Sequence, residues 1–265
     1  MTPAVAVLGY GAFVPGYGGV SDWADGVASP EHEAPVAAIV PKRQRRRASV
    51  LSKALADAYA ETLAGTTVDP ATIAWVFGSA LGEATTMVGL LDQMWKDAAK
   101  FSPMKFATSV HNAASGMISI ATENRGITTA IGADYDTPGM ALLGGIGLVL
   151  ARNEAVVVCC GDEAPPEDLV PDGLGWSLMT SAIALGPVND ANASCATLCG
   201  LAIAPESIDT PEVKAAPELL ASVGRNPNIG LLDLVVALRR ESVGVLRLDR
   251  GAGRGYSVRI GPRTP

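Results

Sequence analysis

Four adjoining segments of the sequence decide the fold: ITTAIGA at 127–133, DYDTP at 134–138, GMALLGGIGLVLA at 139–151 and AVVVCC at 155–160. The first and last are short, apolar and rich in β-branched residues, which predicts buried strands. The second is a turn that ends in a proline suited to the first position of a helix. The third is apolar all round, which predicts a helix buried on nearly all sides. This βαβ unit predicts an α/β protein with a mixed, mostly parallel sheet and a buried helix after the sharp turn.

The same patterns extend outward from this unit. Towards the N-terminus they predict strands over 5–8 and 73–77 and helices over 49–64, 87–95 and 112–122. Towards the C-terminus they predict strands over 179–185 and 196–204, a helix over 231–239, and a hairpin of strands 243–248 and 256–260. We expect residues 1–205 to form one domain, with 206–265 packed on it as a short helix and hairpin.

Composition excludes several classes of protein. The 265 residues are 48% hydrophobic and 18% charged, which is enough apolar surface for a sizeable core. With 27 acidic and 20 basic residues the net charge is −7, which argues against binding to nucleic acid or to an anionic membrane. No apolar run approaches the ~20 residues of a spanning helix, and no signal peptide is predicted. Four cysteines without a C-x-x-C pair favour a reducing compartment, so we expect a cytoplasmic protein.

The chain is also poor in the residues of common catalytic and metal sites. His32 and His111 are its two histidines, which excludes a histidine-rich metal site. The sequence contains no G-x-S-x-G, H-E-x-x-H or G-x-x-x-x-G-K-[ST] motif, and the glycines over 9–16 are wrongly spaced for dinucleotide binding. We therefore expect neither a metal nor a cofactor.

An ordered series of motifs surrounds the βαβ unit: VLGYGAFVPG (7–16), VDP (68–70), VFGS (76–79), SP (102–103), SVHNAASG (109–116) and RG (125–126). In their order and spacing they resemble the N-terminal half of the β-ketoacyl synthases, which are condensing enzymes of the thiolase superfamily. The resemblance covers most of the first 205 residues. It implies a thiolase-like half-fold.

The resemblance also implies where a catalytic residue would lie. In this family the strand after Arg-Gly ends at a cysteine nucleophile on a tight turn before a buried helix. Counting from Arg125-Gly126, that position falls on Tyr135, and a phenol ionises far less readily than a thiol. The family's two catalytic histidines belong to its C-terminal half, and no histidine follows His111 here. We therefore expect no catalytic residue.

The length has a similar implication, because the chain holds one half of a synthase and a short tail. Short relatives without the cysteine resemble the chain length factors of polyketide and aryl-polyene pathways. These pair with an active ketosynthase, and we expect the same here in fatty-acid or polyketide-type biosynthesis, as a heterodimer or a homodimer. Two alternatives stay open: an acyltransferase or condensing enzyme with an unconventional nucleophile near Tyr135, and a free-standing protein that binds acyl chains or acyl carrier protein.

Five residues form the candidate pocket: His111, Asn112, Asp134, Tyr135 and Asp136. Two carboxylates beside a phenol can carry out acid–base chemistry, but Asp136 or Thr137, just before Pro138, is better explained as a helix N-cap. His111 could donate a proton in a pocket, but next to a helix-capping Asn112 it is better explained as a hydrogen-bonded structural residue.

Two candidate interaction surfaces complete the sequence predictions. The strand Ile127, Thr128, Thr129, Ala130 and Ile131 is uncharged and corresponds, by the resemblance, to the dimer strand of condensing enzymes. A basic cluster of Lys42, Arg43, Arg45, Arg46 and Arg47 would suit an acidic acyl carrier protein, although a solvated helix start explains it as well.

Overall fold

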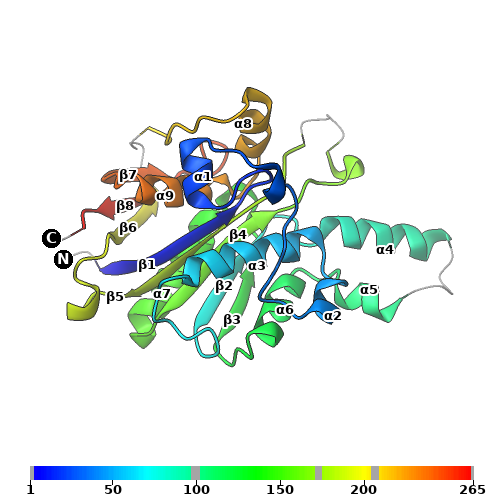
Figure 1. The fold of residues 1–265 in the computed structure, drawn as a ribbon, viewed down its shortest axis with the longest axis horizontal. Helices are drawn as coiled ribbons and strands as arrows, with labels where there is room; N and C mark the ends of the chain where they lie inside the picture. Colours follow the sequence, from blue (N-terminus) through cyan, green and yellow to red (C-terminus); the bar gives the residue numbers. More distant parts are fainter. Residues whose placement is uncertain (1–2, 97–101, 171–174, 204–208, 264–265) are drawn as a thin grey trace.

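The computed structural model describes residues 3–96, 102–170, 175–203 and 209–263. One eight-stranded sheet runs through this part of the chain in the order β3-β2-β4-β5-β1-β6-β8-β7 (Figure 1). The strands are β1 (Ala4–Phe13), β2 (Ala74–Gly78), β3 (Thr128–Ile131), β4 (Val156–Asp162), β5 (Met179–Pro187), β6 (Thr197–Ile203), β7 (Gly244–Arg247) and β8 (Tyr256–Gly261). The helices are α1 (Val20–Asp25), α2 (Lys42–Arg45), α3 (Val50–Leu63), α4 (Ala84–Lys96), α5 (Pro103–Ala107), α6 (Ala113–Ala121), α7 (Thr137–Arg152), α8 (Pro217–Gly224) and α9 (Ile229–Arg239).

The sheet is mixed, as predicted, but most of its pairings are antiparallel. β2 pairs in parallel with β3 and β4, and the pairings β4–β5, β5–β1, β1–β6, β6–β8 and β8–β7 are antiparallel. The expectation of a mostly parallel sheet is therefore corrected. The error arises because β4 and the first eight residues of β5 are buried throughout. The sequence of a strand buried on both faces does not show whether its neighbours run parallel or antiparallel to it.

Helices cover both faces of the sheet and create two hydrophobic cores. α7 and α9 pack on one face, where they meet Val76, Val158 and Leu185. α3 and α6 pack on the other, where they meet Trp75 and Val157. Successive side chains of a strand point to opposite faces, so β2 and β4 supply both cores.

β1 is longer than predicted because glycine has a packing role there. Gly9 and Gly11 were expected to break the chain after residue 8, yet the strand continues to Phe13. A Cβ added at Gly9 would lie 2.2 Å from the carbonyl oxygen of Thr62, and one at Gly11 would lie 2.4 Å from that of Ala58. These glycines let the backbone of α3 approach the strand closely.

Helix α7 is buried along one face rather than on nearly all sides. Ala141, Leu142 and Val149 are buried against the sheet, whereas Leu143 is 46% exposed and Leu150 is 50% exposed. The composition of an apolar helix cannot distinguish a face covered by the sheet from one left open.

The C-terminal residues belong to the same sheet and core. Ten of the eleven residues of α9 are buried, and β8 pairs with β6. The predicted domain boundary after residue 205, and residue 204 of the predicted strand over 196–204, lie outside the described residues. No helix in the described part of the chain is long and apolar enough to cross a membrane.

Candidate functional site

The carboxyl ends of the three parallel-paired strands lie at one edge of the sheet, where ligand sites of α/β proteins usually occur. β3 leads there into a single 3₁₀ turn, Asp134–Asp136, which we call the elbow, and α7 starts directly after it. Asp134 has a φ of 51°, in the left-handed region, which makes it the sharply turned residue of the elbow. β3 and α7 are therefore joined by a sharp turn, with Asp134 at its bend and Tyr135 next to it.

Thr137 closes the elbow from the side of the helix. Its Oγ1 accepts a hydrogen bond from the backbone N–H of Ala133 at 3.0 Å and donates one to the carbonyl oxygen of Asp134 at 2.6 Å. Asp136 occupies the N-cap position, but its side chain makes no capping hydrogen bond. The expected capping role of Asp136 is therefore corrected.

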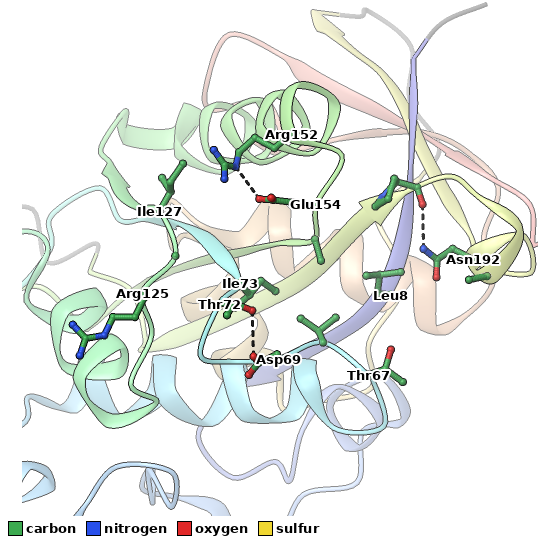
Figure 2. A pocket seen from close by; sticks show the side chains of 15 residues that line it. Leu8, Thr67, Asp69, Thr72, Ile73, Arg125, Ile127, Arg152, Glu154 and Asn192 are labelled. Atoms are coloured by element: carbon green, nitrogen blue, oxygen red, sulfur yellow. Dashed lines mark hydrogen bonds and ion pairs between the residues drawn. The ribbon is translucent and has the colours of Figure 1, made fainter.

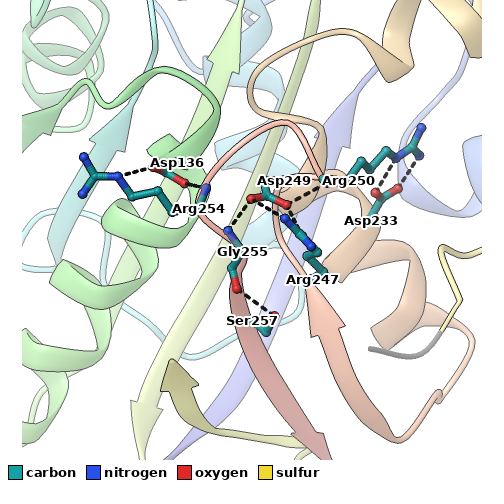
Figure 3. Close-up of polar contacts among 9 residues, drawn as sticks. Asp136, Asp233, Arg247, Asp249, Arg250, Arg254, Gly255 and Ser257 are labelled. Atoms are coloured by element: carbon teal, nitrogen blue, oxygen red, sulfur yellow. Dashed lines mark hydrogen bonds and ion pairs between the residues drawn. The ribbon is translucent and has the colours of Figure 1, made fainter. Parts of the chain in front are cut away.

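The carboxylate of Asp136 instead holds the loop between β7 and β8 (Figure 3). It accepts a hydrogen bond from the backbone N–H of Arg254 at 2.8 Å, and the Arg254 guanidinium lies 3.5 Å from its second oxygen. A Cβ added at Gly139, in the first turn of α7, would lie 2.5 Å from Cβ of Tyr256 in β8. The C-terminal hairpin is thus packed directly against the elbow.

Two further aspartates fix this hairpin loop (Figure 3). Asp249 accepts hydrogen bonds from the backbone N–H groups of Gly251 at 2.8 Å and Gly255 at 2.6 Å, and it pairs with Arg247. Burial acts to raise the pKa of Asp249, but these hydrogen bonds and the guanidinium outweigh it and lower the pKa. Asp233 of α9 forms a bidentate pair with Arg250, with both distances 2.7 Å.

His111 and Asn112 have contacts of a structural kind. Nε2 of His111 donates to the carbonyl oxygen of Ser79 at 2.8 Å, and the ring packs against Phe77 at 5.6 Å between centroids. A Cβ added at Gly132, two residues before the elbow's bend, would lie 3.3 Å from this Nε2. The histidine therefore braces the strand that leads to the elbow. Asn112 precedes α6, but its side chain makes no capping hydrogen bond.

The sequence analysis missed the buried carboxyl at this edge, Asp162, which is the last residue of β4. Its two oxygens accept hydrogen bonds from Ser79 Oγ at 2.6 Å, from the backbone N–H groups of Ala80 at 2.9 Å and Leu81 at 3.0 Å, and from Asn228 Nδ2. Burial raises the pKa of Asp162 to about 6 against the lowering effect of these donors. An acidic residue directly after a buried strand was the available sequence signal.

No thiol lies at the elbow. Of the four cysteines in the sequence, Cys159 and Cys160 are inside β4, where burial raises the pKa of both thiols. Cys199 is in β6 and Cys195 lies just before it. A buried, protonated thiol is a poor nucleophile. None of the three residues of the elbow offers a thiol.

The predicted interaction residues are at the surface. β3 is the edge strand of the sheet, with Thr128 and Thr129 exposed. In the basic cluster, Arg45 donates to the carbonyl oxygen of Val36 at 3.2 Å. Within the described residues the other four cations of the cluster make no ion pair.

A groove of about 690 Å³ lies at the opposite edge of the sheet, at the amino ends of β2, β3 and β4 (Figure 2). The hydroxyl of Thr72 donates a hydrogen bond to the carboxylate of Asp69 at 3.3 Å, and Arg152 forms an ion pair with Glu154 at 2.8 Å. Asn192 Nδ2 donates to the carbonyl oxygen of Pro187 at 3.1 Å. These three contacts lie apart and do not converge on a common point (Figure 2). We assign it no ligand.

The mixed sheet with helices on both faces and a sharp turn before α7 defines a thiolase-like α/β domain. Residues 21–210 match the family described as beta-ketoacyl synthase, N-terminal domain. This match spans more than half of the chain, so the protein belongs to the β-ketoacyl synthase N-terminal domain family. A comparison with curated proteins gives no match.

Three solved structures share the fold over nearly the whole chain. A chain of the ketosynthase (ApeO) in complex with its chain length factor (ApeC) from Xenorhabdus doucetiae aligns with a TM-score of 0.67 at 19% identity, covering 98% of this chain and 99% of that one. A chain of the ishigamide ketosynthase/chain length factor gives 0.67 at 15%, covering 99% and 100%. A chain of AntDE:AntF, a type II polyketide synthase acyl-carrier protein in complex with its ketosynthase, gives 0.72 at 13%, covering 99% and 100%. At these identities the likeness concerns the fold.

Proposed function

We propose that this chain is a non-catalytic subunit that pairs with an active ketosynthase, in the manner of a chain length factor. One observation carries the proposal: Asp134, Tyr135 and Asp136 form the sharp turn between β3 and α7, where the resemblance places the family's cysteine. Carbon–carbon bond formation from an enzyme-bound thioester needs a thiolate that accepts the acyl group. The partner supplies that thiolate.

The proposed binding surface consists of β3 and the open face of α7, which we call the β3–α7 surface. Leu143, Gly147 and Leu150 share this helix face at a spacing of four and three residues. A Cβ added at Gly144 would lie 3.4 Å from Cδ1 of Ile131, so the exposed helix face adjoins the strand. Ile127, just before β3, is 42% exposed and extends the apolar area.

An exposed edge strand without charged residues invites pairing with another strand. Natural proteins usually place charges on such an edge or cover it. Coverage by a partner would continue the sheet into the second subunit and bury the exposed leucines of α7. Two solved structures that share the fold, each of a ketosynthase with a chain length factor, support a ketosynthase as that partner.

A second apolar surface supports a large interface. Helices α4 and α5, which we call the arm, extend away from the sheet (Figure 1). The apolar side chains exposed on the arm are Met87, Leu91, Met94, Trp95, Met104 and Phe106. Exposed apolar side chains in this number indicate an interaction site rather than a solvated helix.

The basic cluster is the proposed docking site for acyl carrier protein. Arg47 lies two residues before Ser49, whose hydroxyl donates to Glu83 at 2.8 Å, and Glu83 directly precedes α4. The cluster therefore lies at the base of the arm, next to the loop that follows β2. Four exposed cations without internal partners attract an acidic, phosphate-bearing protein in an otherwise acidic chain.

The test is co-purification with a cysteine-bearing ketosynthase encoded beside this chain's gene. We expect Leu143→Asp and Thr129→Asp to weaken the complex by at least about 100-fold, because each buries an unpaired carboxylate at the contact. Val27→Asp is the matched control, since Val27 is 57% exposed and lies near α1, away from the β3–α7 surface. Folding of each variant is checked by circular dichroism. Unchanged affinity of both folded variants would refute the proposed surface, and a chain that stays monomeric beside the ketosynthase would refute the proposed function.

A further inference from the structure

The arm joins the rest of the molecule at two places, the start of α4 and the segment after α5 that holds His111. In α4 the buried residues are Ala84 and Leu90, and the helix extends away from the sheet (Figure 1). The backbone bends just before it at Gly82, which has a φ of 62°. The contacts of the first turn therefore control how firmly the start of α4 is held.

Two buried carboxyl groups make these contacts. Glu83, which is 2% exposed, accepts hydrogen bonds through Oε1 from the hydroxyls of Ser49 at 2.8 Å and Ser52 at 2.7 Å, both at the start of α3. Glu163, 5% exposed, accepts one from the backbone N–H of Thr85 at 2.9 Å. One carboxyl thus ties the arm to α3 and the other ties it to the end of β4.

Neither carboxyl has a cation to balance it. Within the described residues neither Glu83 nor Glu163 is in an ion pair, and Oε2 of Glu83 is buried with no hydrogen-bond partner. Two buried carboxylates side by side repel each other, and an unpaired buried charge is costly. A proton on the free Oε2 of Glu83 removes both costs and leaves the two serine hydrogen bonds in place.

We propose that the start of the arm is a proton-dependent attachment, held firmly when Glu83 is protonated and loosened when Glu83 loses its proton. This goes beyond the proposed function and does not depend on it. Its consequence is that pH sets how rigidly the apolar side chains of the arm are presented.

The groups around Glu83 act on its pKa in both directions, and burial has the largest effect. Burial raises the pKa of Glu83, the hydroxyls of Ser49 and Ser52 lower it, and the charge of Glu163 raises it; the net shift is upward. His111 contacts the preceding Gly82, and Asp162 is bonded to the adjoining loop at Ala80 and Leu81. Because the attached form holds the proton more tightly than the loosened form, detachment becomes easier as pH rises from the ordinary glutamate range to the raised pKa. The opening equilibrium changes by up to tenfold per pH unit in that window and levels off above it.

Hydrogen exchange of the whole chain between pH 4.5 and 8 tests the proposal. The reporter is the amide of Met87, which donates to the carbonyl oxygen of Glu83 at 2.9 Å, with each rate divided by its intrinsic rate at the same pH. We expect protection of this amide to fall with rising pH, more steeply than that of β4 amides. Glu83→Gln, which mimics the protonated group, should abolish this excess slope. Glu167→Gln removes an exposed carboxylate near Glu163 and should behave as wild type.

A second variant, Glu163→Gln, keeps the proposal testable if Glu83→Gln does not fold. This variant removes the charge that repels Glu83 and keeps an oxygen that accepts from the N–H of Thr85. The loss of protection at Met87 with rising pH should therefore be complete at a lower pH than in wild type. A slope that persists in Glu83→Gln, or one that is absent from wild type, would overturn the proposal. Suppression of the slope by sodium or magnesium ions at constant pH would overturn it as well, because a bound cation rather than a proton would then balance the two carboxylates.

Discussion

Replacement of Asp162 by asparagine tests whether burial or hydrogen bonding governs the carboxyl beside the elbow. Four donors favour the ionised form of Asp162, yet burial is stronger and raises its pKa from 3.8 to about 6. The folded protein therefore holds this proton more tightly than the unfolded chain. The stability that Asp162 contributes is therefore greatest below about pH 4 and is lost as pH rises through about 6. At about 1.4 kcal/mol for each pKa unit, the loss from this one group is about 3 kcal/mol.

Asparagine keeps the shape of the side chain but cannot ionise. Asp162→Asn should therefore lack this loss, and the difference in unfolding free energy between variant and wild type should grow by about 3 kcal/mol in favour of the variant from pH 4 to pH 7. Hydrogen-bond donors that face the new amide group can lower the stability of the variant. This cost does not depend on pH, so it does not alter how the difference in unfolding free energy changes with pH. The measurement is urea unfolding followed by tryptophan fluorescence, with the exposed Asp168→Asn as control. A difference that is flat, or that moves in favour of wild type, would show that the hydrogen bonds outweigh burial and that the reasoning is wrong.

Three further predictions concern the elbow, the basic cluster and the hairpin. Tyr135→Cys should give no condensation of malonyl and acyl thioesters by the purified chain, because a thiol alone lacks the histidines of the family; product formation without another ketosynthase would contradict this. The double variant Arg43→Glu with Arg46→Glu should weaken binding of acyl carrier protein at least tenfold at low salt and less at high salt, as measured by titration calorimetry, while the exposed Arg259→Glu should not. Arg250→Gln leaves the buried Asp233 unpaired and should lower the unfolding free energy by about 3–5 kcal/mol, whereas Asp25→Asn, which breaks an exposed pair with Arg239, should change it by less than about 1 kcal/mol.

The local elements could be predicted from the sequence because their signals are local. The helix predicted over 49–64 is α3, Val50–Leu63, and Ser49 accepts the capping hydrogen bond from the backbone N–H of Ser52. Cys159 and Cys160 point to opposite faces of the sheet, as successive residues of a strand must. In these cases the residue and the contact it predicts lie within a few positions of each other.

The contacts that complete the site could not be predicted, because they join distant parts of the chain. Asp136 meets Arg254, 118 positions away, and Asp162 meets Ser79, 83 positions away. The direction of the strands could not be predicted either, because a strand buried on both faces shows no sequence period that distinguishes parallel from antiparallel neighbours. For Asp136 the local pattern was misleading: the sequence of a good N-cap is present, but the carboxylate is used by the hairpin.

One local contact and two long-range contacts give the elbow a role that needs no nucleophile. Asp136 fixes the loop between β7 and β8, Thr137 closes the turn, and Gly139 lets Tyr256 pack on the first turn of α7. Together they determine where β3 ends and in which direction α7 starts, and these two elements form the β3–α7 surface. None of the three contacts involves a group that takes part in acyl transfer. The proposed partner surface therefore does not depend on a thiol at the elbow, whereas replacement of Asp136 or Gly139 would disturb the packing that orients it.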